Sequence, residues 1–237
     1  TFRARALNRL GFAQESDALL EKGLAWLAGG TSAQKRNAET NRAWMLFDRG
    51  QAGRAEMEFT RLRDLTDPAN DAEMADREAW RARALFASGR PDEAQAAVAQ
   101  AVELAGWAGV EAPLFLADLA LMEAGLLYGR YEEALAARER ALDLVEAQLG
   151  AWENVVRSQG ALLHLRRGDV EEARREIDQA TRATPGGADG WRLRSRCEAI
   201  SLEVGAAEGN WDGSRAVDLA DALLQAEYYG WAAELLC

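Results

Sequence analysis

Very few residues of this sequence have side chains that commonly carry out chemistry. The chain of 237 residues has a single histidine, His164, and two cysteines, Cys197 and Cys237. These residues cannot supply the ligands of the usual structural zinc sites. We interpret His164, within the apolar stretch ALLHLRR, as a core histidine with a hydrogen-bonded ring nitrogen, and Cys197 as a small buried residue. The sequence therefore predicts no metal, no cofactor and no catalytic residue.

Pairs of neighbouring charged residues are the next candidates for chemistry. Glu132–Glu133 and Glu171–Glu172 have the composition of an acid–base pair, but each stands where a helix is expected to begin, and acidic residues stabilise that end of the helix dipole. The basic stretches Arg166–Arg167 and WRLRSRC are typical of solvated helix faces or intrachain ion pairs. No phosphate-binding loop, GxGxxG or GxSxG string occurs. We therefore expect that the chain is not an enzyme.

Composition excludes further classes of function. The chain carries 39 acidic against 28 basic residues, for a net charge of -11, which repels nucleic acid. No run of 18 apolar residues is present, and the N-terminal TFRARALNRL lacks the apolar core of a signal peptide. Two cysteines are too few for a disulfide framework, which fits a reducing compartment. These features predict a cytoplasmic protein that binds neither nucleic acid nor membrane.

The helices that position these residues can be predicted from an internal repeat in the sequence. Glycines recur every 39 to 41 residues, and a small residue follows each of them five positions later; the pairs are Gly11–Ser16, Gly50–Ala55, Gly89–Ala94, Gly129–Ala134, Gly168–Ala173 and Gly209–Ser214. Small or apolar residues also stand seven positions before each glycine, at Ala4, Ala43, Ala82, Met122, Ala161 and Leu202. The twelfth position after it is occupied by Gly23, Leu62, Ala101, Ala141, Ala180 and Asp221.

Each repeat has the pattern of two helices joined at the glycine. A helical pattern such as ETNRAWMLFDR precedes the glycine, and a second one such as RPDEAQAAVAQAVELA follows it. Glycine adopts the left-handed conformation that ends a helix, and the small residue after it lets the two helices approach closely. We predict turns at Gly50, Gly89, Gly129, Gly168 and Gly209, and buried alanines at Ala55, Ala94, Ala134 and Ala173. Such hairpins bury both faces only by stacking on one another.

These patterns resemble the tetratricopeptide repeat over nearly the whole chain. GLLYGRYEEALAARERALDL and LLHLRRGDVEEARREIDQATRATP match it best, and Pro185 stands where the family has its terminal proline. The resemblance implies an all-α, right-handed superhelical solenoid of about six antiparallel hairpins, one domain over residues 1–237. The period of about 40 exceeds the family's 34 and is shared with HEAT repeats, but the spacing from glycine to alanine favours the tetratricopeptide family.

In that family the first helix of each hairpin lines a concave wall. The frame set by the glycines predicts a partner-binding surface made of Trp44, Phe47, Arg83, Phe86, Glu123, Leu127 and Arg166. Most of the eight tryptophans are expected in the core between helices. An apolar strip with interleaved charges is typical of a binding surface for an extended or helical segment. Close packing of the helices, or another part of the protein filling the groove, would explain the same strip.

With its period of about 40 residues, the chain also resembles the repeat regions of bacterial LuxR-class ATP-dependent regulators and of caspase-like CHAT proteases. The resemblance implies a non-catalytic scaffold for protein or peptide partners in a signalling protein. The alternatives are a sensor of a small effector, a repeat region that controls an attached protease, an enzyme or a structural spacer. We also expect the chain to be a segment of a longer protein and to self-associate through uncapped ends.

Overall fold

The computed structural model describes residues 2–9, 12–149, 152–184 and 187–225, and these residues form helices with no β-strand among them. None of the helices in these ranges combines the length and the apolar character needed to cross a bilayer. The helices are α1 (Phe2–Arg9), α2 (Ala13–Trp26), α3 (Ser32–Asp48), α4 (Ala52–Asp64), α5 (Asp71–Ala87), α6 (Pro91–Ala108), α7 (Ala112–Tyr128), α8 (Tyr131–Leu144), α9 (Glu153–Arg167), α10 (Val170–Arg182), α11 (Gly187–Ala207) and α12 (Gly213–Gln225), with a 3-10 turn at Leu27–Gly29 and a π-helical turn at Val145–Leu149.

The predicted turn glycines separate the two helices of each hairpin. Gly50, Gly89, Gly129, Gly168 and Gly209 all have positive φ, between 72° and 90°. Gly168, for example, ends α9, and the following Asp169 N–H bonds back to the His164 carbonyl at 2.9 Å. This left-handed geometry suits glycine because it has no Cβ. The five predicted turns are confirmed, whereas Gly11 and Pro185 lie outside the described residues.

Capping residues and acidic residues stabilise the N-terminal ends of several helices. Thr31 and Gln34 form a reciprocal capping box at the start of α3, and the Asn70 side chain accepts the Glu73 N–H before α5. The acidic pairs Glu132–Glu133 and Glu171–Glu172 stand in the first turns of α8 and α10, where the helix dipole favours them. They therefore stabilise helix ends, as expected.

The small residues after the turns lie at helix contacts. Ala55, Ala94, Ala134 and Ala173 are all fully buried, so this prediction is confirmed. The residues seven positions before the glycines are buried as well, from Ala4 through Leu202. At Gly125 an added Cβ would lie only 2.2 Å from the Ala134 Cβ, which shows how closely α7 and α8 approach.

The last hairpin departs from the predicted register by two residues. Ser214 and Asp221 are exposed, and Ala216 and Leu223 are buried in their places. The cause is a longer turn: the Ala216 N–H bonds to the Asp212 carbonyl, whereas in the α7–α8 hairpin the Ala134 N–H bonds to Arg130, directly after its glycine. The equivalence proposed for Ser214 and Asp221 was wrong, because counting from the glycine ignores an insertion in the turn.

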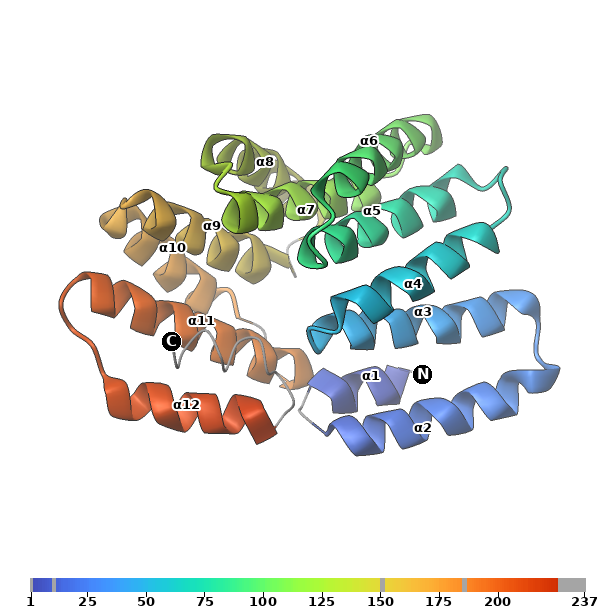
Figure 1. The fold of residues 1–237 in the computed structure, drawn as a ribbon, viewed down its shortest axis with the longest axis horizontal. Helices are drawn as coiled ribbons and strands as arrows, with labels where there is room; N and C mark the ends of the chain where they lie inside the picture. The colour runs from blue at the N-terminus through green and yellow to red at the C-terminus, as the bar shows by residue number, and fades with distance from the viewer. Residues whose placement is uncertain (1, 10–11, 150–151, 185–186, 226–237) are drawn as a thin grey trace.

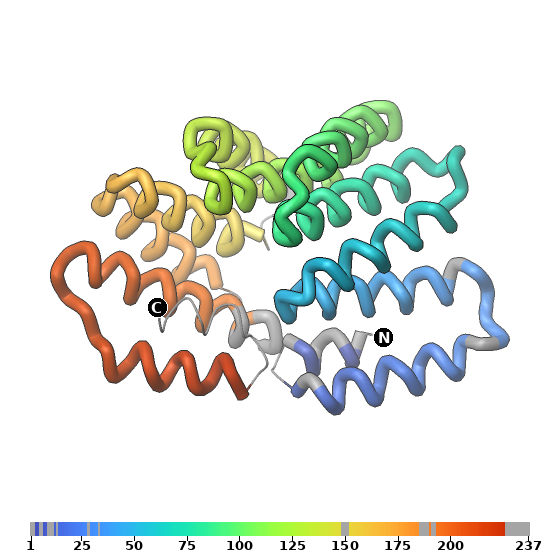
Figure 2. Tube along the Cα trace, viewed as in Figure 1, coloured from blue at the N-terminus to red at the C-terminus, as the bar shows by residue number. Residues whose placement is uncertain are grey.

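The hairpins follow one another around an arc from α1–α2 to α11–α12, and the two ends of this arc lie next to each other (Figures 1 and 2). The first helices contact each other in turn: α1 contacts α3, Trp44 of α3 contacts Trp80 of α5, and α5, α7, α9 and α11 contact in sequence. Helix α11 also contacts α1, at the other end of the series. The first helices of the hairpins therefore form a closed circuit around a shared centre.

Candidate functional site

A cavity of about 410 Å³ lies where five of the first helices converge. It is lined from α3 to α11 by Phe47, Gly50, Ala87, Glu123, Leu126, Leu127, Leu162, Arg196, Ala199, Ile200 and Glu203. Its wall is mostly apolar, with two carboxylates and one guanidinium group. This is the composition of a small-ligand pocket, an apolar surface with a few polar groups that fix orientation.

An aromatic cluster supports the wall on the side of α3 and α5. Trp80 is buried, and its ring lies 5.7 Å from Trp44, 5.9 Å from Phe47 and 5.9 Å from Phe59, measured between centroids. The Arg83 guanidinium lies over both the Phe47 and the Trp80 rings, at 4.9 and 4.5 Å. Cation–π attraction to the two rings therefore helps to hold the Arg83 guanidinium in place, in addition to its ion pair.

Arg83 and Glu123 form a bidentate ion pair between α5 and α7. Arg83 Nε donates to Glu123 Oε2 at 3.0 Å and Nη2 donates to Oε1 at 2.6 Å. Gln159 of α9 donates a further hydrogen bond to Oε1 at 3.1 Å. The side chain of Arg83 is only 8% exposed. Glu123 is thus held at both oxygens, and Arg83 is not presented to a partner.

A second arginine–glutamate pair joins α9 and α11 at the rim of the cavity. Arg166 Nη2 lies 3.0 Å from Glu203 Oε2. The Arg166 side chain is 50% exposed and that of Glu203 is 22% exposed. This pair is open to solvent on the arginine side, so its attraction is screened more than that of the Arg83 pair.

The predicted surface residues separate into four groups. Phe47, Glu123 and Leu127 line the cavity. Trp44 and Arg83 lie behind the wall, against Trp80, and Arg166 stands at the rim. Phe86 is 1% exposed and packs in the core with Leu85, Ala94 and Ala97, so it cannot contact a partner as predicted. The sequence pattern predicted the helix that contains Phe86, but it did not show that neighbouring helices bury this side chain.

All four lining residues of α11, which are Arg196, Ala199, Ile200 and Glu203, were absent from the predicted set. Arg196, Ala199 and Ile200 stand seven, four and three positions before Glu203 and therefore share its helix face. The sequence contained this signal: Glu203 stands six positions before the turn glycine Gly209, as Glu123 does before Gly129, and the other three share its helix face.

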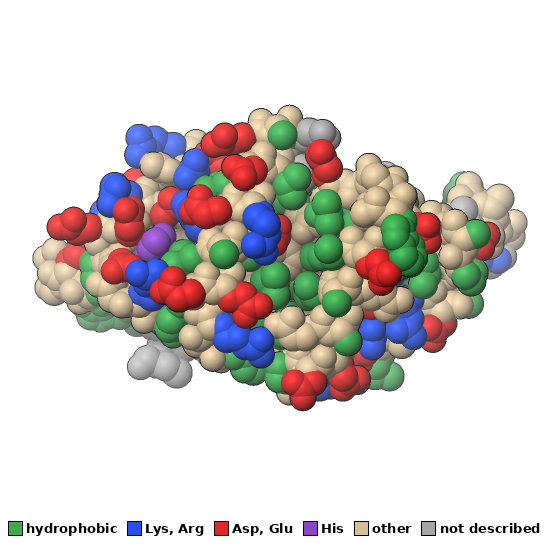
Figure 3. Space-filling model, turned by 90° about the horizontal axis from the view of Figure 1, so that it is seen from above, with side chains coloured by type: hydrophobic (Ala, Val, Ile, Leu, Met, Phe, Trp, Pro, Cys, Tyr) green, Lys and Arg blue, Asp and Glu red, His purple; other side chains and the backbone are tan. Residues whose placement is uncertain are grey.

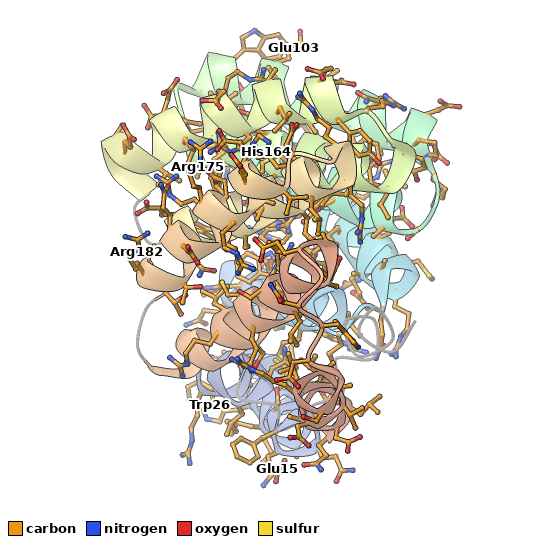
Figure 4. The ribbon with its side chains drawn as sticks, turned by 90° about the vertical axis from the view of Figure 1, so that its left-hand side faces the viewer. Glu15, Trp26, Glu103, His164, Arg175 and Arg182 are labelled. Atoms are coloured by element: carbon orange, nitrogen blue, oxygen red, sulfur yellow. The ribbon has the colours of Figure 1, made fainter. Side chains whose placement is uncertain are left out.

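His164 and Cys197, two of the residues singled out for chemistry, do not line the cavity. His164 is partly buried among the helices (Figure 4), and its Nδ1 lies 3.7 Å from Asp169 Oδ2. Nδ1 makes no hydrogen bond within the described part of the chain, so the predicted hydrogen bond of a ring nitrogen is not found at this atom. Cys197 is buried as predicted, and the Asn154 amide lies 3.3 Å from its sulfur, whereas Cys237 falls outside the described residues. Within those residues no three His, Cys, Asp or Glu side chains cluster as metal ligands would.

Several tryptophans are on the surface instead of in the core. Trp80 is buried and Trp44 and Trp152 are partly buried, but Trp26, Trp107 and Trp211 are exposed. Trp26, at the end of α2, is labelled in Figure 4 and is 83% exposed. The expectation that most tryptophans lie between helices was wrong for these three. A helical sequence pattern does not show whether a neighbouring hairpin covers a given tryptophan.

A second hollow of about 510 Å³ lies on the outside, between α6 and α8 and over α7. It is lined by Val102, Leu114, Ala117, Asp118, Leu121, Arg140, Asp143 and Leu144. Figure 3 views the molecule from this side and shows hydrophobic side chains among charged ones. Burial raises the pKa of the Asp118 carboxyl, and the hydrogen bond from Arg140 Nε at 3.0 Å opposes that shift.

Comparison of the sequence with models of known protein families finds no match, and comparison with curated proteins finds none either.

Proposed function

We propose that this chain is a non-catalytic recognition module of a cytoplasmic bacterial signalling protein, and that its central cavity receives a small effector. The observation that carries the proposal is the convergence of five first helices on one mostly apolar cavity of about 410 Å³. Ligand pockets for small molecules typically measure about 300–1,000 Å³. A ligand in this position touches helices from α3 to α11 and so reports on most of the chain at once.

The alternative of a long peptide groove has less support. Such a groove requires an open strip along the first helices, but Phe86 is in the core and Arg83 is paired with Glu123. The contact between α1 and α11 joins the two ends of the arc. We propose that the hairpins form a right-handed, tetratricopeptide-like solenoid that curls until its ends meet, which leaves a cavity in place of a groove.

Binding in the cavity is testable with a neutral apolar dye. Nile red should bind the wild type with a saturable rise in fluorescence, because the dye is emissive in apolar surroundings. Ala199→Phe fills the cavity from α11 and should abolish this signal. Ala206→Phe places the same side chain at an exposed position of the same helix and serves as the matched control. Equal dye binding by both variants would contradict a site in the cavity.

The outer hollow between α6 and α8 favours a second candidate function, the docking of a protein partner. Val102 at its edge is 45% exposed, and Val217 on α12 is 49% exposed but outside the hollow. A partner that uses the hollow should be captured by the wild type and by Val217→Arg but not by Val102→Arg in a pull-down. Loss in both variants, or in neither, would remove the hollow from consideration.

A further inference from the structure

The two carboxylates of the cavity differ in how firmly their partners hold them. Glu123 accepts three hydrogen bonds, two from Arg83 and one from Gln159, and its arginine is buried against two aromatic rings. A ligand that displaced Arg83 would leave a guanidinium group buried without its counter-ion, which is strongly unfavourable. Glu123 is therefore part of the fixed wall.

Glu203 is held by an arginine that can leave at little cost. Arg166 reaches it from the rim through Oε2, and half of the arginine side chain is in solvent. If another cation takes its place on Glu203, Arg166 returns to water, and exposed pairs of this kind contribute only about 0–1 kcal/mol. Glu203 is thus an exchangeable acceptor on the cavity wall.

The surroundings of Glu203 determine what kind of cation would replace Arg166. Leu126, Leu162 and Ile200 line the same cavity, so the ligand gains by burying an apolar body next to its charge. The net charge of -11 attracts cations to the chain and opposes the approach of anions. Arg196 is the basic residue of the lining, and an anion recognised there would also face the two carboxylates.

Building on the proposed effector site, we propose that the ligand is an amphiphilic cation, an ammonium or guanidinium group on an aliphatic body. Glu203 pairs with its charge, Arg166 competes with it, and the apolar wall holds its body. The two residues therefore have opposite roles, and changing them should move affinity in opposite directions.

The test is an NMR titration of the intact chain at neutral pH and low salt with three probes of equal length: hexylammonium, hexan-1-ol and hexanoate. Hexylammonium should bind most tightly and hexanoate most weakly. Glu203→Gln should weaken hexylammonium binding about tenfold, a typical effect of losing a charge-assisted hydrogen bond, and leave hexan-1-ol binding unchanged. Arg166→Gln should strengthen hexylammonium binding several-fold, because it removes the competitor.

The outcomes separate this inference from the proposed function. Equal binding of hexylammonium and hexan-1-ol, unaffected by Glu203→Gln, would overturn the cationic ligand while leaving an effector cavity intact. Tightest binding of hexanoate would overturn it in favour of an anion recognised by Arg196. Failure of all three probes to bind would also overturn it, and the Nile red titration then decides independently whether the cavity binds ligands at all. Circular dichroism of both variants checks that they fold, and Arg166→Gln changes only a half-exposed side chain.

Discussion

Two successive pairs of hairpins, α5–α8 and α9–α12, follow one plan but hold the cavity in different ways. In each, an arginine on the first helix of one hairpin pairs with a glutamate on the first helix of the next. In α5–α8 the pair is Arg83–Glu123, with the arginine buried against Phe47 and Trp80. In α9–α12 it is Arg166–Glu203, with the arginine half in solvent. The same two residue types thus form a fixed support in one region and an exchangeable contact in the other.

The aromatic neighbours account for this difference. The rings of Phe47 and Trp80 cover the Arg83 guanidinium and exclude water from its bonds to Glu123, which strengthens them. Near Arg166 and Glu203 the lining residues are the aliphatic Leu162 and Ile200. This asymmetry would suit the proposed recognition function, in which one half of the cavity is preorganised and the other half responds to a ligand.

The largest effect is expected from breaking the buried pair. Arg83→Gln leaves Glu123 without its counter-ion and should reduce the free energy of unfolding by about 3 kcal/mol, the lower end for buried pairs because a fifth of the Glu123 side chain is exposed. Arg166→Gln, the matched change in α9–α12, should cost less than about 1 kcal/mol. Urea denaturation of the two variants measures both values. Similar losses would show that the two regions do not differ as described.

A smaller difference is expected at two glycines in equivalent positions, four before the turn. Gly125→Ala in α7 places a Cβ 2.2 Å from that of Ala134, so the helices must separate, at a cost of about 1–3 kcal/mol. Gly205→Ala in α11 meets only the Asn210 carbonyl oxygen, at 3.1 Å, and the gain in helix propensity offsets much of that strain.

Thermal denaturation compares the two glycine variants, and a compensating change tests the cause. The double variant Gly125→Ala, Ala134→Gly removes the close Cβ contact and should recover part of the lost stability. A double variant no more stable than Gly125→Ala would point to a cost other than the α7–α8 contact.

The smallest effect is expected at the starts of the second helices, and it depends on pH. Directly before α12, the Asp212 carboxylate accepts hydrogen bonds from the Arg215 N–H and the Ser214 hydroxyl, and these lower its pKa below the ordinary 3.8. The folded state therefore favours the charged form, so this stabilisation is present above about pH 4 and is lost as the pH falls through the lowered pKa. Arg130, at the start of α8, makes no such side-chain cap.

The comparison at these caps uses melting temperatures at neutral and acidic pH. Asp212→Ala should lower the melting temperature at neutral pH by less than Gly125→Ala does, and the difference from wild type should shrink in acid. Arg130→Ala should have little effect at either pH. A loss for Asp212→Ala that is the same at both pH values would exclude the charged cap as its cause.

Features that depend on a few neighbouring residues were predictable from the sequence. The turn at Gly168 requires a left-handed residue between two helical patterns, and Ala134 is small because two helices of one hairpin meet there. Both constraints act within a single hairpin. Even the error at Ser214 was local, since the two extra residues of the last turn shift the register without changing the plan.

The sequence by itself therefore determined the all-helical hairpin architecture, since short-range constraints of helix termination and close packing repeat along the chain. The tertiary structure alone decided which residues of the predicted wall face the cavity. Phe86 stands three positions before its turn glycine, as Phe47 does, and Arg83 stands six before it, as Glu123 does before Gly129. Phe86 is nevertheless in the core, and Arg83 is held behind the wall by Trp80 and Glu123. The physical reason is that the wall combines helices that are far apart in the chain. The angles between hairpins decide what each side chain contacts, and these angles depend on the sum of many contacts.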